Sequence, residues 1–117
     1  MSLATQAKLQ QHLASAVTYQ VEGRTYRDTV PRIICGDGTT MSVQAGSGLY
    51  CSPRDNDGPW WAVEVGYPSH KLDALMEWAD GPEAPTDTVY GYVPIDVLAR
   101  VIDECGGFAG LDPKGGA

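Results

Sequence analysis

The apolar residues near the start of the chain recur with the period of an α-helix. They stand at positions i, i+4, i+7 and i+8, and glutamines and a lysine fill most of the positions around them. These apolar residues are Leu9, Leu13, Ala16 and Val17. Because this spacing places them on one face of a helix, we expect residues 2–17 to form an amphipathic helix.

Two pairs of β-prone segments follow, each separated by a turn that contains glycine. Residues 18–21 and 25–28 flank a Glu-Gly-Arg turn, and residues 32–35 and 39–45 flank a Gly-Asp-Gly turn. Apolar and polar residues alternate within 39–45, which is the period of a strand. We therefore expect two consecutive β-hairpins.

The middle of the chain changes from loop to strand. Residues 46–59 are rich in Gly, Ser, Asp, Asn and Pro, a composition that predicts a long loop, with room for one short strand. In residues 60–66, Trp61, Val63 and Val65 alternate with the other side chains, so this segment predicts a half-buried strand.

A second helix is predicted after Pro68, with Ser69 as its N-cap and Gly81-Pro82 as its end. Its apolar stripe consists of Leu72, Leu75, Met76 and Ala79. The spacing of these four residues matches the period of an α-helix, so we expect this helix to present its polar residues to solvent.

The end of the chain predicts a strand, a third helix and a tail. Residues 88–93 (TVYGYV) have strand character, and Pro94 fits the first turn of a helix that stops at Gly106-Gly107. Residues 108–117 show too little periodicity for an element, and we expect a frayed tail in which Phe108 and Leu111 could still dock on the domain.

Together these elements predict a single α+β domain over residues 1–117. We expect an antiparallel or mixed sheet of about five to six strands with three helices, in the order α-ββ-ββ-β-α-β-α. No apolar run approaches the roughly 20 residues that cross a bilayer, and the first residues lack the order of a signal peptide. We therefore expect a cytoplasmic protein that has no contact with a membrane.

Charge is distributed unevenly along the chain. The chain has 15 acidic and 8 basic residues, a net charge of −7, and residues 55–117 alone carry 12 acidic against 3 basic residues, a net −9. Residues 1–54 carry a net +2. Nucleic-acid binding requires Lys and Arg to displace counterions from phosphates, so we expect no direct binding to nucleic acid.

Acidic residues gather on the predicted second helix and the linker after it. Asp73, Glu77 and Asp80 stand at i, i+4 and i+7, which predicts one shared helix face, and Glu83 and Asp87 continue the series. One interpretation is a negative surface that docks on a basic partner, with long-range steering. The other interpretation is that these carboxylates only keep the protein soluble.

Aromatic residues are the second group of candidate contacts. Trp60 and Trp61 are adjacent on a predicted strand, so one should be buried and the other either exposed or covered by a helix, and the sequence leaves open which is which. We name Trp60 and Tyr67 as candidate partner contacts, because exposed aromatic residues often supply hot-spot binding energy.

Three cysteines are too few and too widely spaced for a disulfide framework, and we expect reduced thiols. A nucleophilic Cys51 with His70 or His12 as base would make a small cysteine-dependent enzyme, although no recognisable catalytic signature surrounds them. We name no catalytic residue and expect no cofactor.

Two glycine-containing loops resemble ligand sites only in part. Asp55, Asp57, Gly58 and Glu64 match four positions of an EF-hand loop, but Pro53 occupies the first ligand position. The segment GDGTT lacks the spacing of a phosphate-binding loop. We expect both to be turns, and we name no metal ligand.

Residues 40–107 contain the stretches TMSVQAGSGLYCSPRDNDGPWWAVEVGYPS and TVYGYVPIDVLARVIDECGG, which resemble small uncharacterised proteins encoded by bacteriophages and prophages. This resemblance implies a phage or prophage context and no catalytic residues. Small acidic phage proteins include inhibitors of host defence, among them anti-CRISPR proteins and DNA mimics. Strong DNA mimics spread carboxylates over most of their surface, whereas here the first half is slightly basic, which favours a local acidic patch.

We therefore expect a non-enzymatic phage or mobile-element protein that acts in the host cytoplasm. It would bind and inhibit a host protein or nucleoprotein complex through an acidic surface, in the manner of an anti-CRISPR protein. The alternatives are a small Cys/His-dependent enzyme and a virion or assembly component. A homodimer is also open, because an uncovered strand edge would need protection.

Overall fold

The N-terminal helix forms where its apolar spacing predicts it. In the computed structural model, which describes residues 2–112, α1 spans Leu3–Ala14 and fully buries Leu9 and Leu13. The helix ends earlier than expected, with Ser15 as its C-cap, and the chain then leaves as a strand. Val17 therefore lies outside the helix and is largely exposed.

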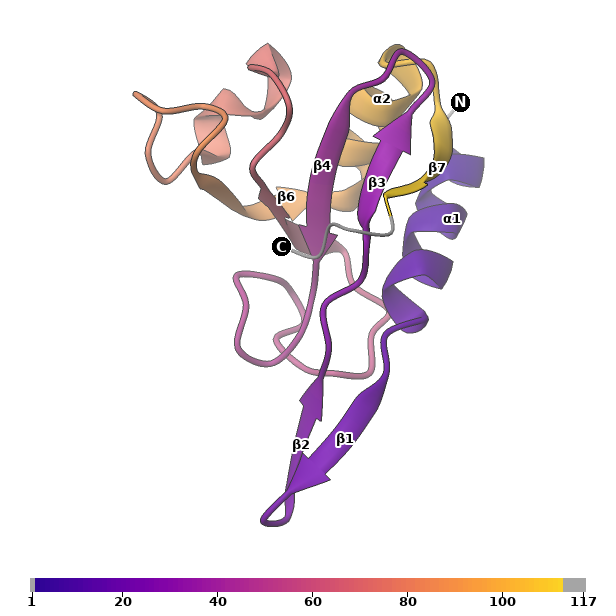
Figure 1. Cartoon of the computed structure of the whole chain (residues 1–117), viewed down its shortest axis with the longest axis vertical. Coiled ribbons are helices and arrows are strands. Elements are labelled where there is room, and N and C mark those ends of the chain that lie inside the picture. The colour runs from indigo at the N-terminus through magenta and orange to yellow at the C-terminus, as the bar shows by residue number, and fades with distance from the viewer. Residues whose placement is uncertain (1, 113–117) are drawn as a thin grey trace.

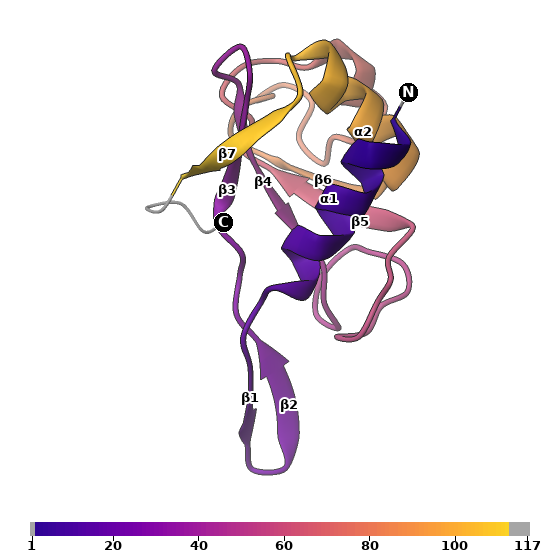
Figure 2. The same cartoon turned by 90° about the vertical axis from the view of Figure 1, so that its right-hand side faces the viewer.

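The first predicted hairpin is confirmed and stands apart from the rest of the protein. Strand β1 (Thr18–Val21) pairs antiparallel with β2 (Arg24–Arg27), and the two form a separate two-stranded sheet. Glu22 and Gly23 both have positive φ, as the tight turn of a two-residue hairpin requires. Figures 1 and 2 show this hairpin projecting from one end of the molecule.

The remaining five strands form one antiparallel sheet in the order β6-β5-β4-β3-β7. Its strands are β3 (Arg32–Cys35), β4 (Thr40–Gln44), β5 (Ala62–Gly66), β6 (Val89–Pro94) and β7 (Phe108–Asp112). The second predicted hairpin is confirmed as β3 and β4. The α+β prediction is thus confirmed, and residues 2–112 hold seven strands, in one sheet of two and one of five, where about five to six were expected.

The expectation of a frayed tail is wrong for residues 108–112. These residues pair with β3, so that Leu111 lies opposite Ile33 and Phe108 lies opposite Cys35. The pairing is non-local, and Phe108 also packs against the core, so these tertiary contacts order a segment that has little periodicity of its own. The rest of the expected tail, 113–117, lies outside the described residues.

Helix α2 (Ile95–Glu104) packs on α1, and the two helices cover one face of the sheet (Figure 2). Gly106 and Gly107, both at positive φ, follow its end as the sequence predicts, whereas Pro94 is the extended N-cap and lies one residue before the first turn in which it was expected. The largest fully buried core residues join both helices to the sheet: Leu9, Leu13, Ile33, Met41, Val43, Val63, Val65, Leu98 and Ile102.

The predicted second α-helix is wrong. Its place is taken by a six-residue 3-10 helix, η1 (Asp73–Trp78). Ser69 does not cap it, because the Ser69 hydroxyl accepts a hydrogen bond from the Thr40 N–H and Leu72 at the N-cap is extended. Only Leu75 is buried within η1, so there is too little apolar contact to hold a longer helix between two prolines.

None of the helices among residues 2–112 is both long enough and apolar enough to cross a membrane.

Candidate functional site

The five predicted acidic contacts lie in η1 and in the connection that leads from it toward β6, residues 73–87, which we call the acidic segment. All five are exposed: Asp73, Glu77, Asp80, Glu83 and Asp87. The shared helix face is wrong, because a 3-10 helix has three residues per turn and places residues i and i+4 about 120° apart. The five carboxylates therefore share one exposed stretch of the chain and not a helical stripe.

Backbone hydrogen bonds and a buried apolar side chain attach the acidic segment to the strand β6 and the core. Leu75 is fully buried, the Asp80 N–H donates to the Val89 carbonyl at 3.0 Å, and the Gly81 N–H donates to the Thr88 hydroxyl at 2.8 Å. The buried Tyr90 hydroxyl donates to the carbonyl of Pro85. The segment thus presents its charges on a supported loop instead of a free one.

Its carboxylates are scarcely used for internal ion pairs. Among residues 2–112, Asp73 forms the segment's one ion pair, with Lys71 at 3.6 Å between two exposed side chains. Such an exposed pair contributes little to stability. Four carboxylates of the segment therefore have no cation from the described part of the chain, and their charge faces solvent.

The prediction that Trp60 is a partner contact is wrong, because the structure buries Trp60 and exposes Trp61. The exposed fractions are 2% for Trp60 and 66% for Trp61. The Trp60 indole N–H donates to the Asp55 carbonyl at 3.2 Å, and the Arg27 guanidinium lies 4.8 Å from its ring. Adjacent residues do face opposite ways, as expected, but sequence alone did not say which one faces the core.

Tyr67, the other predicted aromatic contact, is exposed and lies beside the end of the acidic segment. Its N–H donates to the Thr88 carbonyl at 3.1 Å, next to Asp87. Its backbone has a φ of +50°, and its carbonyl accepts a hydrogen bond from Arg32 at 2.6 Å. The structure therefore brings Tyr67 and Asp87 together, whereas Trp61 is at the opposite end of β5.

A groove of about 320 Å³ beside the acidic segment was missed by the sequence analysis. We call it the tyrosine groove, and it is lined by Tyr50, Trp78, Ala79, Asp80, Val89, Gly91 and Tyr92. The rings of Tyr50 and Tyr92 are 5.9 Å apart and about half exposed. No local signal could reveal it, because its residues come from three separate parts of the chain.

An irregularity in the sheet shapes this groove. Gly91 and Tyr92 together lie opposite Glu64, where the pairing of β5 with β6 shifts by one residue. Tyr92 has a φ of +56°, and its N–H donates to the Tyr50 carbonyl at 2.9 Å. Bulges of this kind redirect side chains, and here the bulge places the Tyr92 ring against Tyr50 at the sheet edge.

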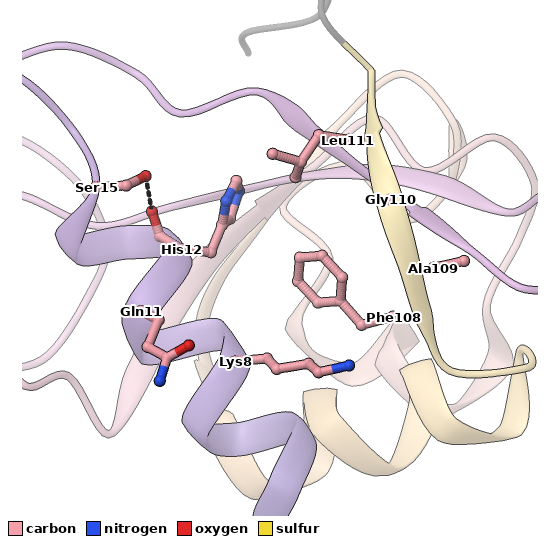
Figure 3. A pocket seen from close by; sticks show the side chains of 8 residues that line it. All are labelled: Lys8, Gln11, His12, Ser15, Phe108, Ala109, Gly110 and Leu111. Carbon is pink, nitrogen blue, oxygen red and sulfur yellow. Dashed lines mark hydrogen bonds between the residues drawn. The ribbon is translucent and has the colours of Figure 1, made fainter.

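The opposite edge of the sheet carries a second groove, of about 440 Å³, between α1 and β7 (Figure 3). Phe108 and Leu111 come from β7, and His12 and Lys8 come from α1. The rings of His12 and Phe108 meet edge to face at 5.7 Å. Burial lowers the pKa of His12 although its Nε2 lies 3.0 Å from the Pro31 carbonyl, so this histidine is neutral at pH 7.

The arrangement does not support the cysteine-dependent enzyme. Cys51 is fully buried, and its sulfur makes hydrogen bonds to Gly46 and Pro53 rather than to a histidine. The His70 Nε2 lies 2.8 Å from the Thr39 hydroxyl. In the part of the chain that the structure describes, neither proposed base forms a hydrogen bond with the proposed nucleophile.

The other two thiols are also unsuited to attack. Burial, with the neighbouring Cys105 and Asp37, raises the pKa of Cys35 to about 12, so Cys35 is a neutral thiol at physiological pH. All three cysteines are free and buried. Thiolate chemistry needs an accessible sulfur with a lowered pKa, which Cys35 does not provide.

The two loops that resemble ligand sites form turns, as predicted. The Asp55 carboxylate accepts hydrogen bonds from the N–H groups of Asp57 and Gly58, and Gly58 has a φ of +66°. The Gly-Asp-Gly loop is the turn between β3 and β4, with the Asp37 carboxylate bound to the Thr39 N–H at 2.9 Å. Residues 2–112 contain no group of three His, Cys, Asp or Glu side chains arranged to hold a metal ion.

Comparisons with known proteins found no match to a family model, to a curated protein or to a solved structure.

Proposed function

We propose that this chain is a non-enzymatic protein of phage or mobile-element origin that binds and inhibits a host protein or nucleoprotein complex. The acidic segment, with Tyr67 at its end, would dock on a basic surface of that complex in the host cytoplasm. The phage origin and the anti-CRISPR-like role rest on the resemblance of residues 40–107.

One observation carries the proposal: the carboxylates of the acidic segment are exposed, supported from below and almost unpaired inside the described chain. Surface carboxylates that only aid solubility need no fixed backbone beneath them. A rigid negative surface loses less conformational entropy when it meets a positive one, and the field of the −9 half speeds the encounter.

The test is capture of partners from bacterial lysate on the immobilised protein, washed at low and then at high salt. The acidic variant carries Asp73→Asn, Glu77→Gln and Asp80→Asn. A matched control removes three exposed charges elsewhere, with Glu22→Gln, Asp57→Asn and Asp96→Asn. We expect a basic nucleic-acid-handling complex to be retained at low salt and released by salt or by the acidic variant, but not by the control.

The captured complex must then lose its own activity when the purified protein is added. Equal loss of binding in both triple variants would show that only net charge matters, and it would contradict a specific acidic surface. Retention of the complex by the acidic variant would contradict the site itself.

A second candidate function, the assembly component, is favoured by the projecting hairpin. On one of its faces the apolar residues Val17, Tyr19, Val21 and Tyr26 are all exposed. Sedimentation of the whole chain tests it: stable self-association that Tyr19→Ser with Tyr26→Ser abolishes would favour assembly over inhibition.

A further inference from the structure

We propose that the tyrosine groove receives a single lysine or arginine side chain from the partner, held by the rings of Tyr50 and Tyr92 and by the carboxylate of Asp80. This inference rests on the proposed function, because it names the chemical group by which a basic surface would be recognised. It assigns to the groove a role that the acidic segment alone does not have.

The rings provide a surface that attracts cations. The face of an aromatic ring carries negative potential, and a guanidinium or ammonium group within about 6 Å of its centre is attracted. In this molecule the Arg54 guanidinium lies over the Tyr50 ring, 5.6 Å from its centre, and so engages one face of that ring from within the chain. The partner's cation would therefore meet the exposed ring of Tyr92 and the part of Tyr50 that faces the groove.

Asp80 supplies the charge that selects a cation over a neutral group. It lines the same groove, is exposed, and makes no ion pair with any residue in 2–112. Glu64 adds negative charge nearby, since its carboxylate accepts a hydrogen bond from the Tyr50 N–H at 3.0 Å. An apolar occupant would desolvate Asp80 without pairing it, and an anionic occupant would be repelled.

The two rings are held in place before any partner arrives. The Tyr92 N–H donates to the Tyr50 carbonyl, which ties the two backbones together. Gly91 permits this approach, because a Cβ at that position would lie 3.1 Å from the Cβ of Tyr50. The positive φ of Tyr92 is a strained conformation, and strain of this kind is maintained where the surroundings require it and often marks a binding site.

The experiment is an NMR titration of the full chain with N-acetyl-arginine amide. The control probe is N-acetyl-citrulline amide, which has nearly the same shape and no charge. We expect shifts at Tyr50, Asp80 and Tyr92 with the arginine probe and none with citrulline. Equal shifts from both probes, or shifts spread evenly along the acidic segment, would overturn the proposal.

Variants locate the binding. Tyr92→Ala should lower the affinity for the arginine probe about fivefold, whereas Tyr92→Phe should retain that affinity because the ring face remains. Asp80→Asn leaves both rings intact and should lower the affinity for the probe about threefold. The matched control is Tyr19→Ala. Tyr19 and Tyr26 form a ring pair that is about as exposed as Tyr50 and Tyr92, but the same face of the hairpin carries Arg24 and no acidic residue. Unchanged affinity in both Tyr92→Ala and Asp80→Asn would overturn the proposal.

The outcome separates this inference from the proposed function. If the host complex is lost in the acidic triple variant but retained by Tyr92→Ala, the acidic surface stands and the side-chain pocket is wrong. If no complex is captured but the arginine probe still binds the groove, the inhibitor function is wrong and the cation site stands.

Discussion

The two edges of the five-stranded sheet are protected in different ways. Outside β6, the sheet continues as loops: the Asp80 N–H bonds to Val89, and the Tyr92 N–H bonds to Tyr50. Outside residues 108–111 of β7, no other described segment forms a backbone hydrogen bond, and the neighbouring feature is the groove against α1. The covered edge is the one that carries the carboxylates and the tyrosine groove.

This difference leaves charged and aromatic side chains as the outer surface at β6, whereas at β7, the open edge, the outward main chain of residues 108–111 has no described neighbour. A strand edge with free N–H and C=O groups can pair with almost any extended segment, so it confers little selectivity. At β6 those groups are largely satisfied, and the surface is instead defined by charges and ring faces. Lys8 at the open edge is also opposite in sign to the acidic segment.

The largest effect should come from removing the anchor of the covered edge. Leu75→Ala deletes a fully buried side chain that holds η1 against β6, and we expect it to lower the free energy of unfolding by about 2–5 kcal/mol. Urea unfolding measures the change. Leu3→Ala, at a residue that is 73% exposed, is the matched control and should change stability by less than about 0.5 kcal/mol.

Amide hydrogen exchange of the Leu75→Ala variant, measured segment by segment, tests whether the two sheet edges differ in stability. Amides of the acidic segment should lose protection in Leu75→Ala, and those of β7 should keep theirs. A uniform loss along both edges would mean that the two edges unfold as one unit and that the contrast between them has no energetic basis.

An intermediate effect is expected at Tyr90, which supports the acidic segment from within β6. Tyr90→Phe removes the hydroxyl that donates to the Pro85 carbonyl and should cost about 1 kcal/mol in urea unfolding. The ring stays in the core, so the loss isolates the hydrogen bond. A neutral result would show that this contact does not hold the segment.

The smallest effect concerns His12 at the open edge and depends on pH. Burial lowers its pKa below 6.5 in the folded state, so below about pH 6.5 the unfolded chain binds more protons than the folded chain. The free energy of unfolding should therefore fall as the pH decreases from 6.5 toward that lowered pKa. In urea unfolding measured between pH 7 and pH 5, His12→Asn should reduce the change of the unfolding free energy with pH. An unchanged pH dependence would mean that other groups cause it.

Local patterns predicted much of the fold. Both hairpins were predictable because glycine-containing turns separate β-prone runs, and α2 was predictable from Pro94, its apolar stripe and the two glycines after it. The prediction of η1 as an α-helix failed because its apolar spacing matched a helix, while only Leu75 within it finds a buried place. Strand β7 was missed because its pairing with β3 spans most of the chain.

The candidate site was predictable only where charge alone defines it. The five acids are close in sequence, and all five are exposed in the structure. The choice of Trp60 failed because alternation gives two opposite faces without saying which is the core side. The tyrosine groove depends on a bulge, on Gly91 and on a residue from a distant loop, none of which has a local signature.

The projecting hairpin has a practical consequence for the capture experiment. Its tip at Glu22 and Gly23 lies away from both sheet edges, and a side chain added at Gly23 would meet no atom within 4 Å (Figure 2). Loop tips of this kind accept attachments and insertions readily. Because all three native cysteines are buried, a cysteine introduced by Glu22→Cys provides one accessible thiol for attaching a fluorophore or a surface tether. The protein can then be immobilised with its acidic segment and its tyrosine groove facing the solution.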